Sequence, residues 1–119
     1  MPTILIVDDD DAVRGTLYDL LSERYECHTT GMAEEALQYL EVEAYDAVLT
    51  DLTLPGLDGV SLLKAIRTRR PATPVIMISG KSGEDGESLN EMGAFAYLTK
   101  PFSLAEVEQV IERALGQKG

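Results

Sequence analysis

The sequence predicts an α/β protein in which five βα units surround a parallel sheet. Short runs rich in aliphatic and β-branched residues alternate with longer stretches whose apolar residues recur at helical spacing, which is typical of βα units. The first and fourth short runs are the most continuously apolar, as expected of central strands that helices cover on both faces. The predicted strands are Ile4–Val7, Glu26–Thr29, Ala47–Thr50, Val75–Ser79 and Phe95–Leu98.

Helices are predicted in the stretches between and after these strands. Their apolar residues recur at the spacing that places them on one face of a helix. The last helix is the best defined, because it begins with a capping box from Ser103 to Glu106 and has a natural stop at Gly116. The predicted apolar faces are Val13, Leu17, Leu20 and Leu21; Leu62, Leu63 and Ile66; and Leu104, Val107, Val110, Ile111, Ala114 and Leu115.

The stretch 80–87 is poor helix material. It contains three glycines and several charged residues, and each glycine costs about 1 kcal/mol relative to alanine inside a helix. The sequence therefore predicts a long loop here, followed by a short fourth helix limited to about residues 88–92.

Length and composition predict a single domain over residues 1–119, with a core from about residue 3 to residue 115. The longest apolar runs, Ile4–Val7 and Val75–Ile78, are far too short to cross a bilayer, and the N-terminus lacks the features of a signal peptide. Cys27 is the single cysteine and so has no partner for an internal disulfide. We expect a cytoplasmic protein without membrane contact.

The net charge of −11 argues against direct binding of nucleic acid by this chain, because binding to phosphate backbones depends on clustered Lys and Arg. One basic cluster lies where a helix should end before Pro71. A favourable interaction with the helix dipole explains that cluster about as well as a partner surface does. The cluster consists of Lys64, Arg67, Arg69 and Arg70.

Four consecutive aspartates follow the first predicted strand. Asp10 and Asp11 stand directly before a helix, where carboxylates cap free N–H groups. Asp8 and Asp9 stand at the carboxyl end of the strand, where open α/β sheets bind ligands. Neighbouring ionised carboxylates repel each other unless a cation that prefers oxygen ligands lies between them. The pair therefore predicts a metal site.

Three further polar residues are expected at the same edge of the sheet. Asp51 ends the third strand, Ser79 ends the fourth, and Lys100 follows the fifth. Taken singly, each has an ordinary explanation as a loop, turn or solvated residue. Together with the acidic pair they suit phosphoryl transfer: a metal neutralises the phosphoryl oxygens, the lysine and hydroxyl hold them, and one carboxylate attacks phosphorus.

These strand ends resemble the receiver domain of bacterial two-component response regulators, and the similarity runs over nearly the whole chain. The matching motifs are Ile6–Asp9, Asp51–Gly59, the hydroxyl of Ser79 after Pro74–Ile78, and Tyr97–Phe102. The resemblance implies a doubly wound, flavodoxin-like (CheY-like) (βα)5 fold. Its five-stranded parallel sheet would have the order 2-1-3-4-5, with helices on both faces.

The resemblance also implies a role for each residue of the acidic site. Asp51 would accept a phosphoryl group from the phosphohistidine of a histidine kinase or from a small phosphodonor. Asp9, Asp51 and the backbone carbonyl of Thr53 would bind Mg²⁺ directly, and Asp8 would act mostly through a bound water. Few protein carboxylates and several waters are the usual surroundings of Mg²⁺ in proteins.

The remaining matched residues are implied to detect the phosphoryl group. Lys100 would pair with it, and Ser79 would donate a hydrogen bond to one of its oxygens. Tyr97 would follow Ser79, with its ring turning inward, although an aromatic residue on a strand also has a simple packing role. Gly80, beside Ser79, leaves the phosphoryl group more open to water and predicts faster dephosphorylation.

The implied function is a phosphorelay signalling module that catalyses its own phosphorylation and dephosphorylation and is not a turnover enzyme. Its partners would be a sensor histidine kinase or phosphotransfer protein, and an effector domain or downstream protein. A homodimer through the face formed by the fourth helix, fifth strand and fifth helix is a further option. Stand-alone and multidomain arrangements both remain open.

Three other functions are less consistent with the sequence. A haloacid-dehalogenase-type phosphatase has an Asp-x-Asp pair, whereas the segment Asp51–Thr53 lacks the second aspartate. A flavodoxin-like FMN protein needs a loop that binds phosphate after the first strand, where the four aspartates would repel it. A phosphate-independent adaptor or dimerisation module on the same fold stays an alternative.

Overall fold

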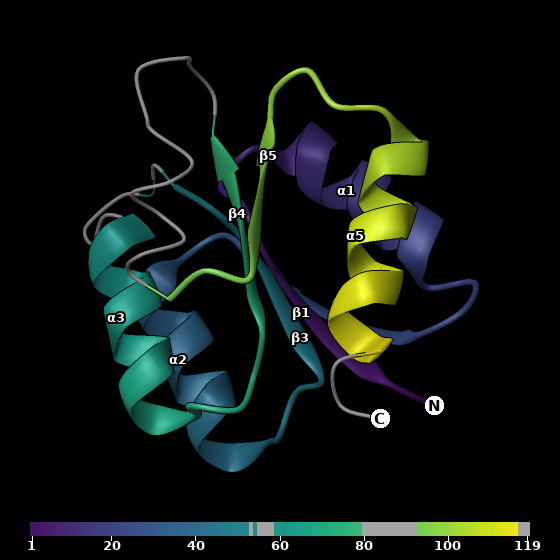
Figure 1. Cartoon of the computed structure of the whole chain (residues 1–119). Helices are drawn as coiled ribbons and strands as arrows, with labels where there is room; N and C mark the ends of the chain where they lie inside the picture. Colours follow the sequence, from purple (N-terminus) through teal and green to yellow (C-terminus); the bar gives the residue numbers. More distant parts are fainter. Residues whose placement is uncertain (53, 55–58, 80–92, 117–119) are drawn as a thin grey trace.

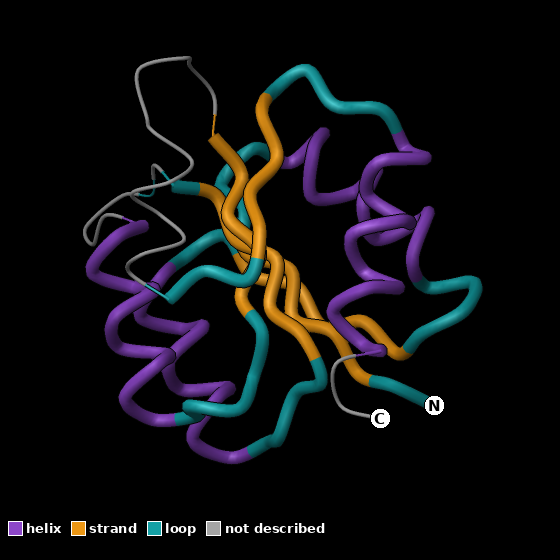
Figure 2. The backbone as a smooth tube through the Cα atoms, viewed as in Figure 1, coloured by secondary structure: helices purple, strands orange, loops and turns teal. Residues whose placement is uncertain are grey.

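The computed structural model describes residues 1–52, 54, 59–79 and 93–116, and its centre is a five-stranded parallel sheet (Figures 1 and 2). The sheet order is β2-β1-β3-β4-β5, so the order that the resemblance implied is confirmed. The inner strands β1, β3 and β4 are almost completely buried, and the edge strands β2 and β5 are not. The strands are β1 (Thr3–Val7), β2 (Glu26–Thr30), β3 (Ala47–Asp51), β4 (Val75–Ser79) and β5 (Ala96–Thr99).

Helices cover both faces of the sheet, as predicted. In Figure 1, α1 (Asp11–Leu21) and α5 (Leu104–Gly116) lie on one side, and α2 (Ala33–Val42) and α3 (Gly59–Arg69) lie on the other. Side chains of a strand alternate between its faces, so each inner strand contributes to both layers. In β1, for example, the side chains of Ile4 and Ile6 pack with α1 and α5, and those of Leu5 and Val7 pack with α2 and α3.

The predicted apolar faces account for most of the helical side of the core. Leu17, Leu62, Leu63 and Ile66 are fully buried, and Leu21 and most of the α5 face are buried beside the sheet. Val13, Leu20 and Leu115 are partly buried against the same cluster.

The capping box of α5 is present with both of its hydrogen bonds. The Ser103 N–H donates to Glu106 Oε1 at 2.8 Å, and the Glu106 N–H donates to Ser103 Oγ at 3.1 Å. These two bonds satisfy N–H groups that the helix itself leaves free. The start of α5 is therefore fixed by local sequence.

Two details of the fifth βα unit differ from the prediction. The strand is Ala96–Thr99 and not Phe95–Leu98, because backbone pairing between Ser79 and Thr99 extends it by a residue that the apolar pattern does not mark. Leu104, which the sequence predicts on the apolar face of α5, is 45% exposed. Helical side chains point toward the N-terminus, and Leu104 is the first residue of α5, so no preceding turn covers it.

The basic cluster at the end of α3 has partners within the chain. Arg70 Nε donates to the Leu40 carbonyl at 3.0 Å, near the C-terminus of α2, and Arg67 Nη1 donates to the Pro71 carbonyl at 2.6 Å. These contacts support the structural explanation of the cluster. The long loop and short helix predicted at 80–92 lie outside the described residues. Within the described part, no helix is long and apolar enough to cross a membrane.

Candidate functional site

Three carboxylates meet at the carboxyl edge of the sheet, where β1 and β3 lie side by side. Asp8 follows β1 directly and Asp51 is the last residue of β3. One oxygen each from Asp8, Asp9 and Asp51 lie within 4.8 Å of one another. Asp8 and Asp51 are buried and Asp9 is exposed. The convergence expected from the strand ends is therefore found.

The buried carboxylate of Asp8 has surroundings that fit a cation. Its Oδ1 accepts a hydrogen bond from the Asp10 N–H at 2.9 Å. Its Oδ2 is buried and has no hydrogen-bond partner in the described part of the chain. Burial, together with the charges of Asp51 and Asp9, raises the pKa of Asp8 above its usual value, although the Asp10 N–H and Lys100 oppose this. An oxygen-binding metal such as Mg²⁺ would satisfy Oδ2 and offset the repulsion.

Lys100 supplies the positive charge at this edge. Its Nζ lies 3.2 Å from Asp51 Oδ2 and 3.8 Å from Asp8 Oδ2. Burial alone would lower the pKa of Lys100, but the charges of Asp8 and Asp51 and the hydrogen bond to Asp51 raise it overall. Lys100 therefore stays charged at neutral pH, in a position to attract an anionic group beside Asp51.

Ser79 and Tyr97 lie on the neighbouring strands. Ser79 is buried at the end of β4, and its carbonyl accepts a hydrogen bond from the Lys100 N–H at 2.8 Å, which joins the ends of β4 and β5. Tyr97 lies on the edge strand β5 and is 43% exposed. Thr53 falls outside the described residues.

The loop from β1 to α1 contains one contact that sequence reasoning missed. Asp10 is the N-cap of α1, as predicted, and accepts from the Ala12 and Val13 N–H groups. Arg14, one turn into the helix, donates from Nη1 to the Asp8 carbonyl at 2.6 Å and pairs with Asp11 through Nη2. The available signal was the Asp11-to-Arg14 spacing, which favours an ion pair within a helix. It does not indicate the bond to Asp8.

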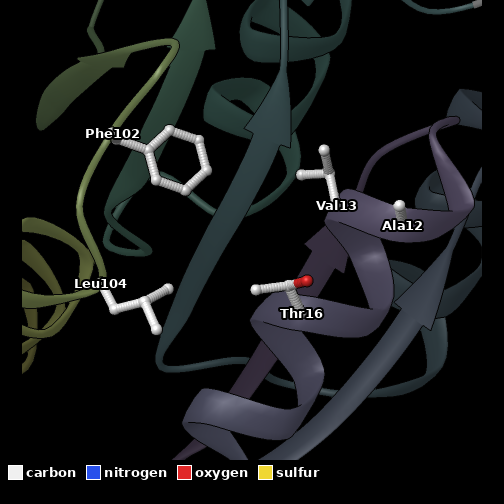
Figure 3. A pocket seen from close by; sticks show the side chains of 5 residues that line it. All are labelled: Ala12, Val13, Thr16, Phe102 and Leu104. Carbon is white, nitrogen blue, oxygen red and sulfur yellow. The ribbon is translucent and has the colours of Figure 1, made fainter.

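A hollow of about 210 Å³ lies beside this loop, between α1 and the segment that leads into α5. Figure 3 shows that Phe102 and Leu104 face the α1 side chains across it. The hollow is mostly apolar, and its lining residues are Ala12, Val13, Thr16, Phe102 and Leu104. Leu104 is the exposed leucine noted above.

Fold and site together define a doubly wound α/β domain with an acidic cluster and a lysine at the carboxyl edge of its sheet. The chain belongs to the response regulator receiver domain family, whose model matches residues 4–112. The resemblance recognised from the sequence motifs is therefore confirmed.

Proteins similar to the chain include a transcriptional regulator and isolated receiver domains. The chain is 38% identical over 112 residues to the DNA-binding transcriptional regulator NtrC of Klebsiella pneumoniae, covering 92% of this chain and 24% of that protein. It is similar to the receiver domain of NtrX from Brucella abortus, with a TM-score of 0.90, 38% identity and coverage of 95% and 98%. A Francisella receiver domain, of response regulator 1452, has a TM-score of 0.92 and 30% identity, with full coverage of both chains.

Family membership establishes the general role. Receiver domains of response regulators are signalling modules that act with histidine kinases and effector domains, and they are generally not turnover enzymes. The chain spans about a quarter of the length of the NtrC relatives.

Proposed function

We propose that Asp51 accepts a phosphoryl group from a histidine kinase or phosphotransfer protein in a Mg²⁺-dependent reaction, within a single receiver domain over residues 1–119. One observation carries the proposal: Asp8, Asp9 and Asp51 converge within 4.8 Å, and Lys100 lies 3.2 Å from Asp51. A nucleophile, a set of metal ligands and a cation are the parts that phosphoryl transfer requires.

The acidic cluster would hold the metal. Asp9 and Asp51, with the carbonyl of Thr53, would bind Mg²⁺ directly, and Asp8 would act mostly through a water. When bound, Mg²⁺ supplies positive charge that neutralises the phosphoryl oxygens. The buried Asp8 Oδ2, without a hydrogen bond in the described part, supports this assignment.

Asp51 would be the nucleophile. One of its carboxylate oxygens forms a bond to phosphorus while the bond from phosphorus to the histidine nitrogen of the donor breaks. The electron pair of that bond stays on the imidazole, and the product on Asp51 is an acyl phosphate. Lys100 already pairs with the Asp51 carboxylate and would transfer this contact to the phosphoryl oxygens, where more negative charge gathers.

The product would be detected at the ends of β4 and β5. Ser79 would donate a hydrogen bond to a phosphoryl oxygen, and Tyr97, exposed in this structure, would turn inward as Ser79 moves. Such a change biases two arrangements of the fourth and fifth βα units, so that local charge produces a surface signal. That surface would control an effector domain or downstream protein, or would form a homodimer.

The phosphodonor must approach the same edge of the sheet. The apolar hollow beside the β1–α1 loop (Figure 3) offers a contact surface next to the acidic cluster for a kinase or phosphotransfer protein. A phosphate-independent adaptor would have no use for the convergence of Asp8, Asp9 and Asp51 beside Lys100, so this alternative is disfavoured.

Incubation with acetyl phosphate and Mg²⁺, followed by intact-mass spectrometry, tests the proposal. The wild-type protein should gain the mass of one phosphoryl group, and Asp51→Asn should gain none. Asp19→Asn, an exposed position on α1, removes the same charge and should react like the wild type. Equal labelling of all three proteins would exclude Asp51 as the acceptor.

A further inference from the structure

Arg14 lies outside the acidic cluster but contacts its backbone. The Arg14 Nη1 atom donates to the Asp8 carbonyl at 2.6 Å, and Nη2 pairs with the Asp11 carboxylate. The Arg14 side chain is 25% exposed and the Asp11 side chain 89% exposed. Most of the Arg14 side chain is therefore buried, and its guanidinium contacts Asp8 and Asp11, the two ends of the aspartate run.

The carbonyl that Arg14 binds belongs to the peptide group that joins Asp8 and Asp9. The orientation of this peptide determines where the Asp9 backbone, and with it the Asp9 carboxylate, is placed relative to Asp8. Asp8 is fully buried and is fixed by packing and by the Asp10 N–H. Asp9 is exposed, so its position depends more strongly on the backbone.

Sheet pairing ends at this point, which explains why the carbonyl needs another donor. The Asp8 N–H still pairs with the Thr30 carbonyl on β2 at 3.1 Å. Two residues after Thr30, the Met32 N–H donates to Thr30 Oγ1 and not to a carbonyl that follows β1. The Arg14 guanidinium on α1 donates to the Asp8 carbonyl where the backbone hydrogen bonds of the sheet end. Hydrogen bonds with a charged partner are stronger than those between neutral groups.

Gly31 provides an independent sign that this contact is built into the fold. A Cβ at Gly31 would lie 3.0 Å from Arg14 Nη1, 3.5 Å from the Asp8 carbonyl oxygen and 3.6 Å from Asp9 Cα. The absence of a side chain at Gly31 thus leaves the space in which the guanidinium reaches the Asp8 carbonyl.

We propose that Arg14 is a positioning residue for the metal site, which sets the peptide between Asp8 and Asp9 so that the Asp9 carboxylate binds Mg²⁺ together with Asp51 while Asp8 contributes through a water. The inference rests on the proposed function, since it assumes that the acidic cluster binds Mg²⁺. Groups that orient metal ligands typically contribute 10–100-fold to metal affinity.

An electrostatic role and a positioning role of Arg14 predict opposite changes in the Mg²⁺ affinity when the arginine is replaced. Removing a positive charge close to three carboxylates strengthens the attraction for Mg²⁺, so an electrostatic role alone predicts tighter binding by Arg14→Gln. A positioning role predicts weaker binding, by about 10-fold. Arg14→Lys keeps the charge but has no planar guanidinium to bind both Asp8 and Asp11. Its loss of Mg²⁺ affinity should be smaller than that of Arg14→Gln.

Titration calorimetry with MgCl₂ on the unphosphorylated protein measures this affinity directly, with the melting temperature without Mg²⁺ measured alongside. Gly31→Ala changes no charge, crowds the guanidinium, and should also weaken Mg²⁺ binding. Arg24→Gln is the matched control, because Arg24 pairs with Glu112 and precedes β2, at the opposite end of the sheet. It should bind Mg²⁺ like the wild type.

The expected result is weaker Mg²⁺ binding for Arg14→Gln and Gly31→Ala, in proteins that stay folded well above the temperature of the titration, with partial recovery in Arg14→Lys. Wild-type affinity, or tighter binding, in Arg14→Gln would overturn the positioning role while leaving the acceptor role of Asp51 intact. A wild-type protein that binds no Mg²⁺ would overturn both proposals.

Discussion

Asp8→Asn should stabilise the protein at neutral pH in the absence of divalent ions. The substitution keeps the size of the side chain and an oxygen that can accept from the Asp10 N–H, but it removes a fully buried charge. That charge lies within 4.8 Å of two other carboxylates and 3.8 Å from one ammonium. Burial and repulsion, which both disfavour the charged form of Asp8, therefore exceed the attraction to Lys100.

The distances give the size of the effect. At an effective dielectric constant of about 20, charges 4.8 Å apart repel by about 3.5 kcal/mol, and Lys100 at 3.8 Å attracts by about 4.4 kcal/mol. Two repulsions and one attraction leave a net cost of roughly 1–3 kcal/mol when solvent screening is included. Asp8→Asn should raise Tm by roughly 4–12 °C.

Thermal unfolding in EDTA, followed by circular dichroism, measures the difference from the wild type, with Asp19→Asn as the control for charge. Because the pKa of Asp8 is raised in the folded state, protonation favours the fold as pH falls through that raised value. The advantage of Asp8→Asn should shrink on the same descent and vanish below the ordinary aspartate pKa of 3.8. A variant no more stable than Asp19→Asn at pH 7 would refute the reasoning.

Two further substitutions test the charge of Lys100 and the N-terminal cap of α5. Lys100→Gln removes the cation beside Asp51. Without Mg²⁺, the free energy of unfolding should fall by about 2 kcal/mol. Calorimetry should show tighter Mg²⁺ binding, and labelling by acetyl phosphate should be slower. Weaker Mg²⁺ binding would contradict the assigned role. Ser103→Ala removes the acceptor of the Glu106 N–H. Thermal unfolding should show a free energy of unfolding lower by about 1 kcal/mol, with labelling by acetyl phosphate unchanged. A loss of labelling would mean that the start of α5 contributes directly to the site.

The sequence was sufficient to predict which residues converge at the site. Parallel strands bring their carboxyl ends to one edge, so Asp8 and Asp51 at the ends of adjacent strands had to meet. The adjacency of those strands came from the family resemblance and not from the apolar pattern. The capping roles of Asp10 and Ser103 were predictable because they depend on residues only two or three positions away.

Features that depend on the path of the backbone were not predictable. Leu104 has helical spacing with Val107, but its exposure depends on the path of the chain before the first turn of α5. The last residue of β5 is defined by pairing with Ser79 and not by its own side chain. Arg14 reaches a carbonyl six positions earlier in the chain, and Gly31, from another loop, leaves the space that this contact occupies.

Binding of beryllofluoride, a phosphoryl analogue, tests the central claim most directly. With Mg²⁺ present, fluorine NMR of the wild-type protein should show resonances of the bound analogue, which disappear when Mg²⁺ is removed by EDTA. Asp51→Asn should show none under the same conditions, and Asp19→Asn should match the wild type. Bound resonances of equal intensity in Asp51→Asn, or binding that is indifferent to Mg²⁺, would contradict a Mg²⁺-dependent phosphoryl acceptor at Asp51.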